Sequence, residues 1–268
     1  MLGEERVIES KKLSTVYGPI RSWRYGNSLG VDLLLHNSIC SFNCIYCQLG
    51  DIQIVTSEQK VYVPTEQVVE DLKQADMASV DLITFSGSGE PTLATNLGEV
   101  IHHVKQVYHK PVMILTNATL FRDPATRARV MEADIVDCKL DGASDGMLQR
   151  FNRPAKGITL QGIVEGIKAL RKEFPGQLHM QCMFMPINLS EAEDLAKLIR
   201  DIKPDLVQLN TPRRPHPTRW DVLYRHSEGG ETGIKESPLK TISLEQAGKI
   251  EEILKSTGVP IVSVYRSQ

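Results

Sequence analysis

Three of the chain's five cysteines fall within eight residues, in the segment Cys40-Ser-Phe-Asn-Cys44-Ile-Tyr-Cys47. Thiolates in this C-x3-C-x2-C spacing can converge on one soft-metal site. A tetrahedral zinc site would require a fourth Cys or His ligand. A [4Fe–4S] cluster has four irons, so three protein thiolates leave one iron open to bind something other than protein. The alternative is a group of ordinary cysteines, which rarely fall so close together.

This spacing, with Tyr46 directly before the third cysteine, resembles the radical S-adenosylmethionine (radical SAM) superfamily. Two further segments within residues 30–210 support the resemblance. Residues 87–91, Gly-Ser-Gly-Glu-Pro, are similar to the Gly-Gly-Glu-Pro element of that family, with Ser88 in place of its first glycine. Residues 137–141, Asp-Cys-Lys-Leu-Asp, resemble the Asp-x-Lys element of the glycyl-radical activating enzymes.

The resemblance implies that Cys40, Cys44 and Cys47 hold a [4Fe–4S] cluster whose open iron binds S-adenosylmethionine (SAM). A flavodoxin- or ferredoxin-like donor would reduce the cluster, and SAM would be cleaved to a 5′-deoxyadenosyl radical that takes a hydrogen atom from the substrate. The catalytic candidates are Lys139 and Asp137. The residues expected to bind SAM are Tyr46, Gly87, Ser88, Gly89, Glu90, Asn117, Asp137, Lys139, Asp141 and Asn210.

Residues 137–141 have two interpretations. Strand alternation places Asp137, Lys139 and Asp141 on one side and Cys138 on the other, so two carboxylates and an ammonium group would face a pocket. The alternative is a structural ion-pair network without a ligand.

The substrate is indicated less directly. Residues 29–34, 44–50 and 209–215 resemble the wyosine-type Fe–S oxidoreductases, which include an enzyme that modifies tRNA. No cysteine precedes Cys40, so the resemblance does not extend to the second cluster of that tRNA enzyme. The expected substrate is therefore a small molecule or a tRNA nucleoside. The candidate substrate contacts, whose guanidinium groups suit phosphate or carboxylate, are Arg213, Arg214 and Arg219.

Two other functions fit parts of the sequence. The residues 137–141 and the long loop after residue 210 also suit an activating enzyme that installs a glycyl radical on a partner protein. A non-catalytic Fe–S protein for electron transfer would instead have four protein ligands and no SAM pocket. The sequence does not indicate the atom from which hydrogen is taken, the fate of SAM, or the oligomeric state.

Apolar runs alternate with amphipathic stretches along the chain. Strands are expected at 31–36, 81–85, 111–115, 134–140, 177–185 and 205–209, and a last strand at 259–264. Helices are expected at about 64–75, 97–109, 124–131, 158–174, 190–199 and 243–255, the last two beginning in capping boxes. This alternation predicts a parallel α/β sheet, and ligands bind at the C-terminal ends of such strands. Both the cysteine and glycine loops follow predicted strands.

Together with the resemblance, the alternation predicts a partial (β/α)6 barrel of the radical SAM type at residues 30–210. An N-terminal arm is expected at 1–29. A C-terminal extension is expected at 211–268, with a substrate-side loop, a helix and a strand.

The composition is that of an ordinary globular protein, with 41% hydrophobic and 24% charged residues among 268. No run of eighteen apolar residues occurs, and the charged start lacks an apolar signal core. We therefore expect a cytoplasmic protein without a membrane span, in a compartment where clustered thiols stay reduced. The net charge of −2 gives no global attraction to nucleic acid.

Overall fold

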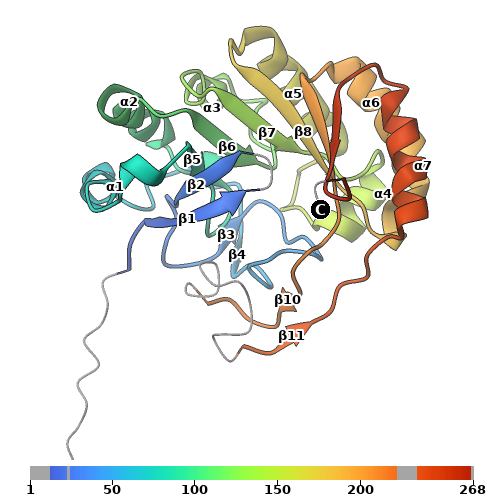
Figure 1. Ribbon diagram of the computed structural model, residues 1–268, viewed down its shortest axis with the longest axis horizontal. Helices are drawn as coiled ribbons and strands as arrows, with labels where there is room; N and C mark the ends of the chain where they lie inside the picture. The colour runs from blue at the N-terminus through green and yellow to red at the C-terminus, as the bar shows by residue number, and fades with distance from the viewer. Residues whose placement is uncertain (1–12, 23–24, 222–233, 267–268) are drawn as a thin grey trace, which may run out of the picture.

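One eight-stranded sheet forms the centre of the protein in the computed structural model, which describes residues 13–22, 25–221 and 234–266 (Figure 1). Parts of the predicted arm (1–12 and 23–24) and of the predicted loop (222–233) therefore lie outside the described residues. In spatial order the strands are β1 (Val16–Ser22), β2 (Gly26–Val31), β5 (Leu82–Phe85), β6 (Val112–Thr116), β7 (Ile135–Lys139), β8 (Gln177–Met183), β9 (Leu206–Asn210) and β12 (Ile261–Ser263).

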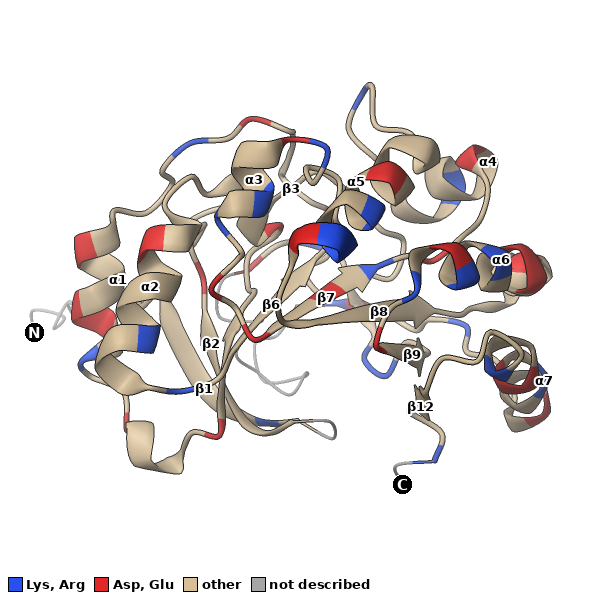
Figure 2. Cartoon of the chain, turned by 90° about the horizontal axis from the view of Figure 1, so that it is seen from above, with Lys and Arg blue, Asp and Glu red and all other residues tan. Residues whose placement is uncertain are grey.

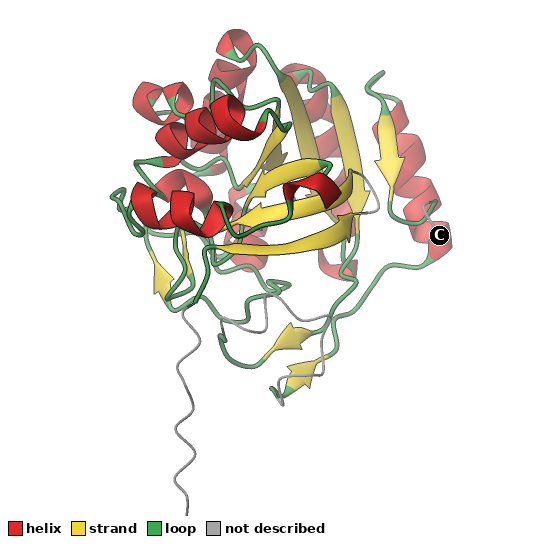
Figure 3. Cartoon of the chain, turned by 60° about the vertical axis from the view of Figure 1, so that its left-hand side comes forward, coloured by secondary structure: helices red, strands yellow, loops and turns green. Residues whose placement is uncertain are grey.

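Every neighbouring pair in this sheet is parallel except β1 and β2, which form an antiparallel hairpin. The sheet curves into a partial barrel with helices outside it (Figure 3). Two short ribbons lie beyond it: β3 (Ile39–Cys40) pairs with β4 (Ile54–Val55), and β10 (His216–Pro217) pairs with β11 (Glu236–Ser237). The predicted α/β partial barrel is confirmed.

The helices follow the strands in the predicted alternation, except for the short helix Asp145–Met147, which the sequence did not predict. They are α1 (Thr65–Leu72), α2 (Leu97–Tyr108), α3 (Pro124–Ala128), α4 (Asp145–Met147), α5 (Leu160–Glu173), α6 (Ala192–Ile202) and α7 (Leu244–Lys255). Short 3-10 turns occupy Met77–Ser79, Pro91–Leu93 and Pro186–Glu191, and a π-helical turn occupies Leu148–Asn152. Figure 2 shows that the charged residues gather on the helices and loops, whereas the strands are mostly tan. In the part of the chain that the structure describes, the helices lack the combined length and apolar character that a membrane-spanning helix requires.

Strand alternation separates an apolar face from a polar face. On the side toward the helices, Cys138 and Cys182 are fully buried in the main core with Ile167 of α5 and Leu195 of α6. Full burial of an Ile or Leu side chain contributes about 1.5–3 kcal/mol. The other side of the same strands carries the polar side chains of residues 137, 139, 179, 181 and 208, and this side faces the barrel interior.

The strand expected at 31–36 is misplaced. The strand in this part of the chain is β2, which follows β1 and ends at Val31, and the apolar run after it is a buried turn. The Asp32 carboxylate accepts the backbone N–H groups of Leu34 at 2.8 Å and Leu35 at 3.1 Å, and Leu35 has a left-handed φ of 51°. Such side-chain bonds to the backbone compete with strand formation.

The two predicted capping boxes had different outcomes. Ser243 and Gln246 form the reciprocal capping bonds at the start of α7. Ser190 does not cap α6, because it lies inside the 3-10 turn that precedes this helix. The neighbouring Glu191 carboxylate instead accepts bonds from the Ala143 N–H and the Ser144 hydroxyl.

Candidate active site

The cysteine loop and the glycine loop are joined by backbone hydrogen bonds beyond the ends of β2 and β5. The Ile39 N–H donates to the Ser88 carbonyl at 2.8 Å, and the Glu90 N–H donates to the Ile39 carbonyl at 3.0 Å. The Ser88 N–H and hydroxyl both donate to Asp32, at 3.0 and 2.5 Å. The residue before the first cysteine is therefore fixed directly against the glycine loop.

The two glycines of this loop are required by backbone geometry. Gly87 has φ = 126° and Gly89 has φ = 151°, a region that L side chains rarely adopt. A Cβ on Gly89 would lie 1.6 Å from the Ile39 carbonyl oxygen, and one on Gly87 would lie 2.6 Å from the Asp32 Cγ. The two glycines therefore allow the glycine loop to pack closely against Ile39 and Asp32.

The three thiols are partly shielded and influence one another electrostatically. Burial raises the pKa of Cys44 to about 12 and that of Cys47 to about 11. Burial also raises the pKa of Cys40 well above its ordinary value, and the Glu90 carboxylate and the other two thiols add to this effect. A raised pKa favours the protonated form of each thiol. Binding of a metal would convert the three thiols to thiolates, because the thiolate is the form that binds metal.

Hydrogen-bond donors point at these sulfur atoms. The Phe42 N–H lies 3.4 Å and the Asn117 amide 3.5 Å from the Cys40 sulfur. The Asn152 amide lies 3.3 Å from the Cys44 sulfur. Donors to sulfur are a recurring feature around iron–sulfur ligands, because they stabilise the negative charge on the thiolates.

The three loop cysteines are not placed as the ligands of one metal ion. Among the described residues, no three His, Cys, Asp or Glu side chains are arranged to hold one metal ion. In a [4Fe–4S] cluster each thiolate binds a different iron, so the sulfurs are spread more widely than the ligands of one ion. All five cysteines are free, and the two outside the loop, Cys138 and Cys182, lie in the apolar core.

Glu90 is a buried carboxylate with several donors. One oxygen accepts from the Thr92 N–H at 3.1 Å and from the hydroxyls of Thr92 and Thr116 at 2.6 and 2.7 Å. The other accepts from the Asn117 N–H at 2.7 Å. Burial raises the pKa of Glu90, although these donors act in the opposite direction. Glu90 thereby ties the glycine loop to the end of β6.

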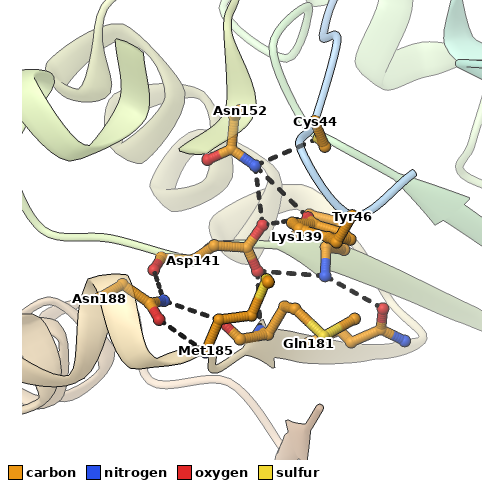
Figure 4. Close-up of polar contacts among 9 residues, drawn as sticks. Cys44, Tyr46, Lys139, Asp141, Asn152, Gln181, Met185 and Asn188 are labelled. Atoms are coloured by element: carbon orange, nitrogen blue, oxygen red, sulfur yellow. Dashed lines mark hydrogen bonds and ion pairs between the residues drawn. The ribbon is translucent and has the colours of Figure 1, made fainter. Parts of the chain in front are cut away.

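Lys139, Asp141 and Tyr46 form one polar group at the end of β7 (Figure 4). The Lys139 ammonium lies 3.1 Å from an Asp141 carboxylate oxygen and 5.1 Å from the centre of the Tyr46 ring. The Tyr46 hydroxyl donates to Asp141, and the tyrosine ring packs at 5.0 Å against Phe151. Burial raises the pKa of the Tyr46 hydroxyl, so it remains a donor. The Asp141 side chain is fully buried, whereas that of Lys139 is 18% exposed.

Asn152 also belongs to this group, although no motif in the sequence singles it out. It ends a π-helical turn that was not predicted, and its amide donates to Asp141 at 2.8 Å. Turns of this kind often occur at functional sites. The π-helical turn points to Asn152, but it is visible in the backbone structure and not in the sequence.

Asp137 and Asn210 lie outside the polar group formed by Lys139, Asp141 and Tyr46. Asp137 accepts from the Gln208 amide at 3.0 Å, and Gln208 also donates to the Tyr25 hydroxyl at 2.8 Å. That hydroxyl lies 2.9 Å from the His179 Nδ1. Asp137 thus belongs to a buried polar network inside the barrel. It precedes Lys139 by two residues on β7. Asn210, at the end of β9, is buried.

The segment after β9 reaches the cysteine loop. The His216 Nδ1 lies 3.1 Å from the Cys47 carbonyl oxygen. A Cβ on Gly50 would lie 2.8 Å from the Pro217 carbonyl oxygen, which shows how closely the two segments approach. Of the three predicted substrate contacts, Arg213 and Arg219 are exposed and Arg214 is half-buried.

A wide cavity lies away from these loops. It has a volume of about 1030 Å³ and opens at the N-terminal ends of β6 to β9. Its two strand-end carboxylates are engaged in ion pairs, Asp134 with Lys105 and Asp205 with Arg171. It is therefore at the sheet edge opposite the cysteines, and we do not assign the chemistry to it.

A family model and several curated proteins match this chain. A family model described as the radical SAM superfamily matches residues 34–199. UPF0026 protein slr1464 from Synechocystis sp. is 40% identical over 251 residues, which cover 92% of this chain and 94% of that protein. GTPase Obg from Brachyspira hyodysenteriae is 36% identical over 219 residues, covering 80% of this chain but 32% of that protein.

A solved structure has the same fold. Streptococcus suis SuiB bound to S-adenosylmethionine matches with a TM-score of 0.59 at 14% sequence identity. The match covers 85% of this chain and 48% of SuiB, so the chain spans about half the length of that protein.

Proposed function

This chain belongs to the radical SAM superfamily, and on that basis we propose that Cys40, Cys44 and Cys47 bind a [4Fe–4S] cluster at which SAM is reductively cleaved. The observation that carries the proposal is the pair of backbone bonds joining the cysteine loop to the Gly87–Glu90 loop. When bound, the cluster and SAM supply a 5′-deoxyadenosyl radical that removes a hydrogen atom from a substrate. The direct test is the formation of 5′-deoxyadenosine.

The residues around the cysteine loop would bind and orient SAM. The glycine loop and Asn117 lie beside Cys40 and would receive the methionine part. Lys139 and Asp141 offer one cation and one anion for the carboxylate and ribose of SAM. Tyr46 offers an aromatic face for the adenine, while Asp137 and Asn210 line the sheet below and beside this position.

Replacing Glu90 with alanine is expected to weaken SAM binding by at least about tenfold, because the end of β6 loses the acceptor that holds it. All three cysteine ligands remain in this variant, so the iron content should stay that of the wild type. SAM affinity is measured by equilibrium dialysis on anaerobically reconstituted protein. Unchanged affinity with a full cluster would remove Glu90 from the SAM site.

We propose a small molecule or a tRNA nucleoside as the substrate. The arginines after β9 and the contact between His216 and the cysteine loop support a substrate side formed by this segment. The resemblance to the wyosine-type oxidoreductases supports the tRNA choice. The proposal also includes a flavodoxin- or ferredoxin-like electron donor and a cytoplasmic location, where the five free cysteines stay reduced.

A tRNA substrate predicts a steep salt dependence of binding, because each neutralised phosphate releases counterions. Charge reversal of Arg213 and Arg219 is expected to lower tRNA affinity about tenfold or more and to reduce the salt slope by about 1 for each phosphate that is no longer neutralised. Lys249→Glu, on α7, serves as a matched charge-reversal control. A tRNA affinity that does not depend on salt, or that is equal in the arginine variant and the Lys249→Glu control, would favour a small-molecule substrate.

A further inference from the structure

Asn152 places one amide group among three acceptors. Its side-chain nitrogen lies 2.8 Å from an Asp141 carboxylate oxygen, 3.3 Å from the Cys44 sulfur and 3.4 Å from the Tyr46 hydroxyl oxygen (Figure 4). The residue is only 2% exposed. A buried amide that is fully engaged in this way holds its partners in one arrangement.

The backbone on either side of Asn152 fixes where this amide points. The Asn43 N–H donates to the Asn152 carbonyl at 2.9 Å, and the Ile45 N–H donates to the Phe151 carbonyl at 3.0 Å. Arg153 then ends the turn in the left-handed region, with φ = 47°, and its N–H donates to the Leu148 carbonyl. The π-helical turn and the cysteine loop are therefore clamped together on both sides of Cys44.

The number of Asn152 amide hydrogens decides whether one is available to the Cys44 sulfur. A primary amide has two hydrogens, and the short 2.8 Å bond to Asp141 uses one of them. The Tyr46 hydroxyl donates its own hydrogen to the same carboxylate. The second amide hydrogen is therefore shared between the Cys44 sulfur and the Tyr46 oxygen. The sulfur thus receives a donor that is itself polarised by the Asp141 carboxylate.

We propose that Asn152 is a positioning residue that orients the Cys44 thiolate and raises the reduction potential of the cluster, an inference that rests on the proposed function. Reduction adds one negative charge, part of which resides on the sulfur ligands. An N–H donor stabilises that charge more in the reduced state than in the oxidised state, and hydrogen bonds to sulfur are among the determinants of cluster potential. Asn152 also links the cluster side to Asp141 on the SAM side.

The test compares the midpoint potentials of wild type and Asn152→Leu by redox titration monitored with electron paramagnetic resonance. The proposal predicts a more negative midpoint in the variant at equal iron and sulfide content per chain. Asn96→Leu is the matched control, because Asn96 is also a buried asparagine but donates to Val63 and Thr65 instead of a cysteine. Its midpoint should equal that of the wild type.

Each outcome decides one claim. An unchanged midpoint in Asn152→Leu with an intact cluster would overturn the inference and leave the proposed function standing. If Asn152→Leu loads no cluster, the shorter Asn152→Ser is measured in its place, and failure of both to load would overturn the tuning role. A wild-type chain that loads no cluster under the same conditions would refute the proposed function itself.

Discussion

Cys44→Ala is expected to abolish cluster binding, with iron affinity reduced more than about 100-fold. Changes to groups that only support a metal ligand already cost about 10- to 100-fold, and this change removes a ligand. Two thiolates remain, and no other cysteine can replace the third, because Cys138 and Cys182 are fully buried on the helix side of the sheet. The measurement is the visible absorbance and iron content after anaerobic reconstitution.

Cys182→Ala provides the control for that result. It removes one sulfur from the core and should lower stability modestly, while the chain still loads iron like the wild type. A Cys44→Ala protein that retained a complete cluster would show that the ligands had been assigned wrongly.

Gly89→Ala is expected to lower the free energy of unfolding by about 3 kcal/mol or more and to prevent cluster loading. The added methyl group would lie 1.6 Å from the Ile39 carbonyl oxygen, so the two loops must separate. The strained φ of 151° adds about 1–3 kcal/mol of its own. Chemical denaturation measures the first effect, and iron content measures the second.

Gly248→Ala is the matched glycine substitution for this comparison. Gly248 lies within α7, and a Cβ there would meet no atom within 4 Å apart from its chain neighbours and the backbone of its own helix. Alanine should therefore stabilise the protein by roughly 0.5–1 kcal/mol through helix propensity. Equal stability of the Gly89→Ala and wild-type proteins would contradict the close packing of the two loops.

Local patterns were sufficient to predict much of the fold. Helical spacing and a capping box located α7, and apolar runs located the parallel strands from β5 to β9. The strand expected at 31–36 is misplaced because Leu33, Leu34 and Leu35 are as apolar as a buried strand. What bends them into a turn is the bonding of Asp32 to their backbone, and apolar periodicity does not register such bonds.

The sequence predicts that the cysteine and glycine loops meet, but it does not predict the contacts that hold them. The spacing of the cysteines and the position of the glycine loop predict two loops at one edge of the sheet. The role of Glu90 as a clamp on Thr116 and Asn117 depends on tertiary contacts between segments 26 or more residues apart. Asn152 lies 108 residues from Cys44, and no local pattern joins them.

The most direct test is anaerobic reconstitution of the wild-type chain with iron and sulfide, followed by SAM and dithionite, with nucleoside products separated by chromatography. We predict methionine and 5′-deoxyadenosine from the wild type and neither from Cys44→Ala. An intact cluster that yields no 5′-deoxyadenosine under these conditions would contradict the proposal that this site cleaves SAM.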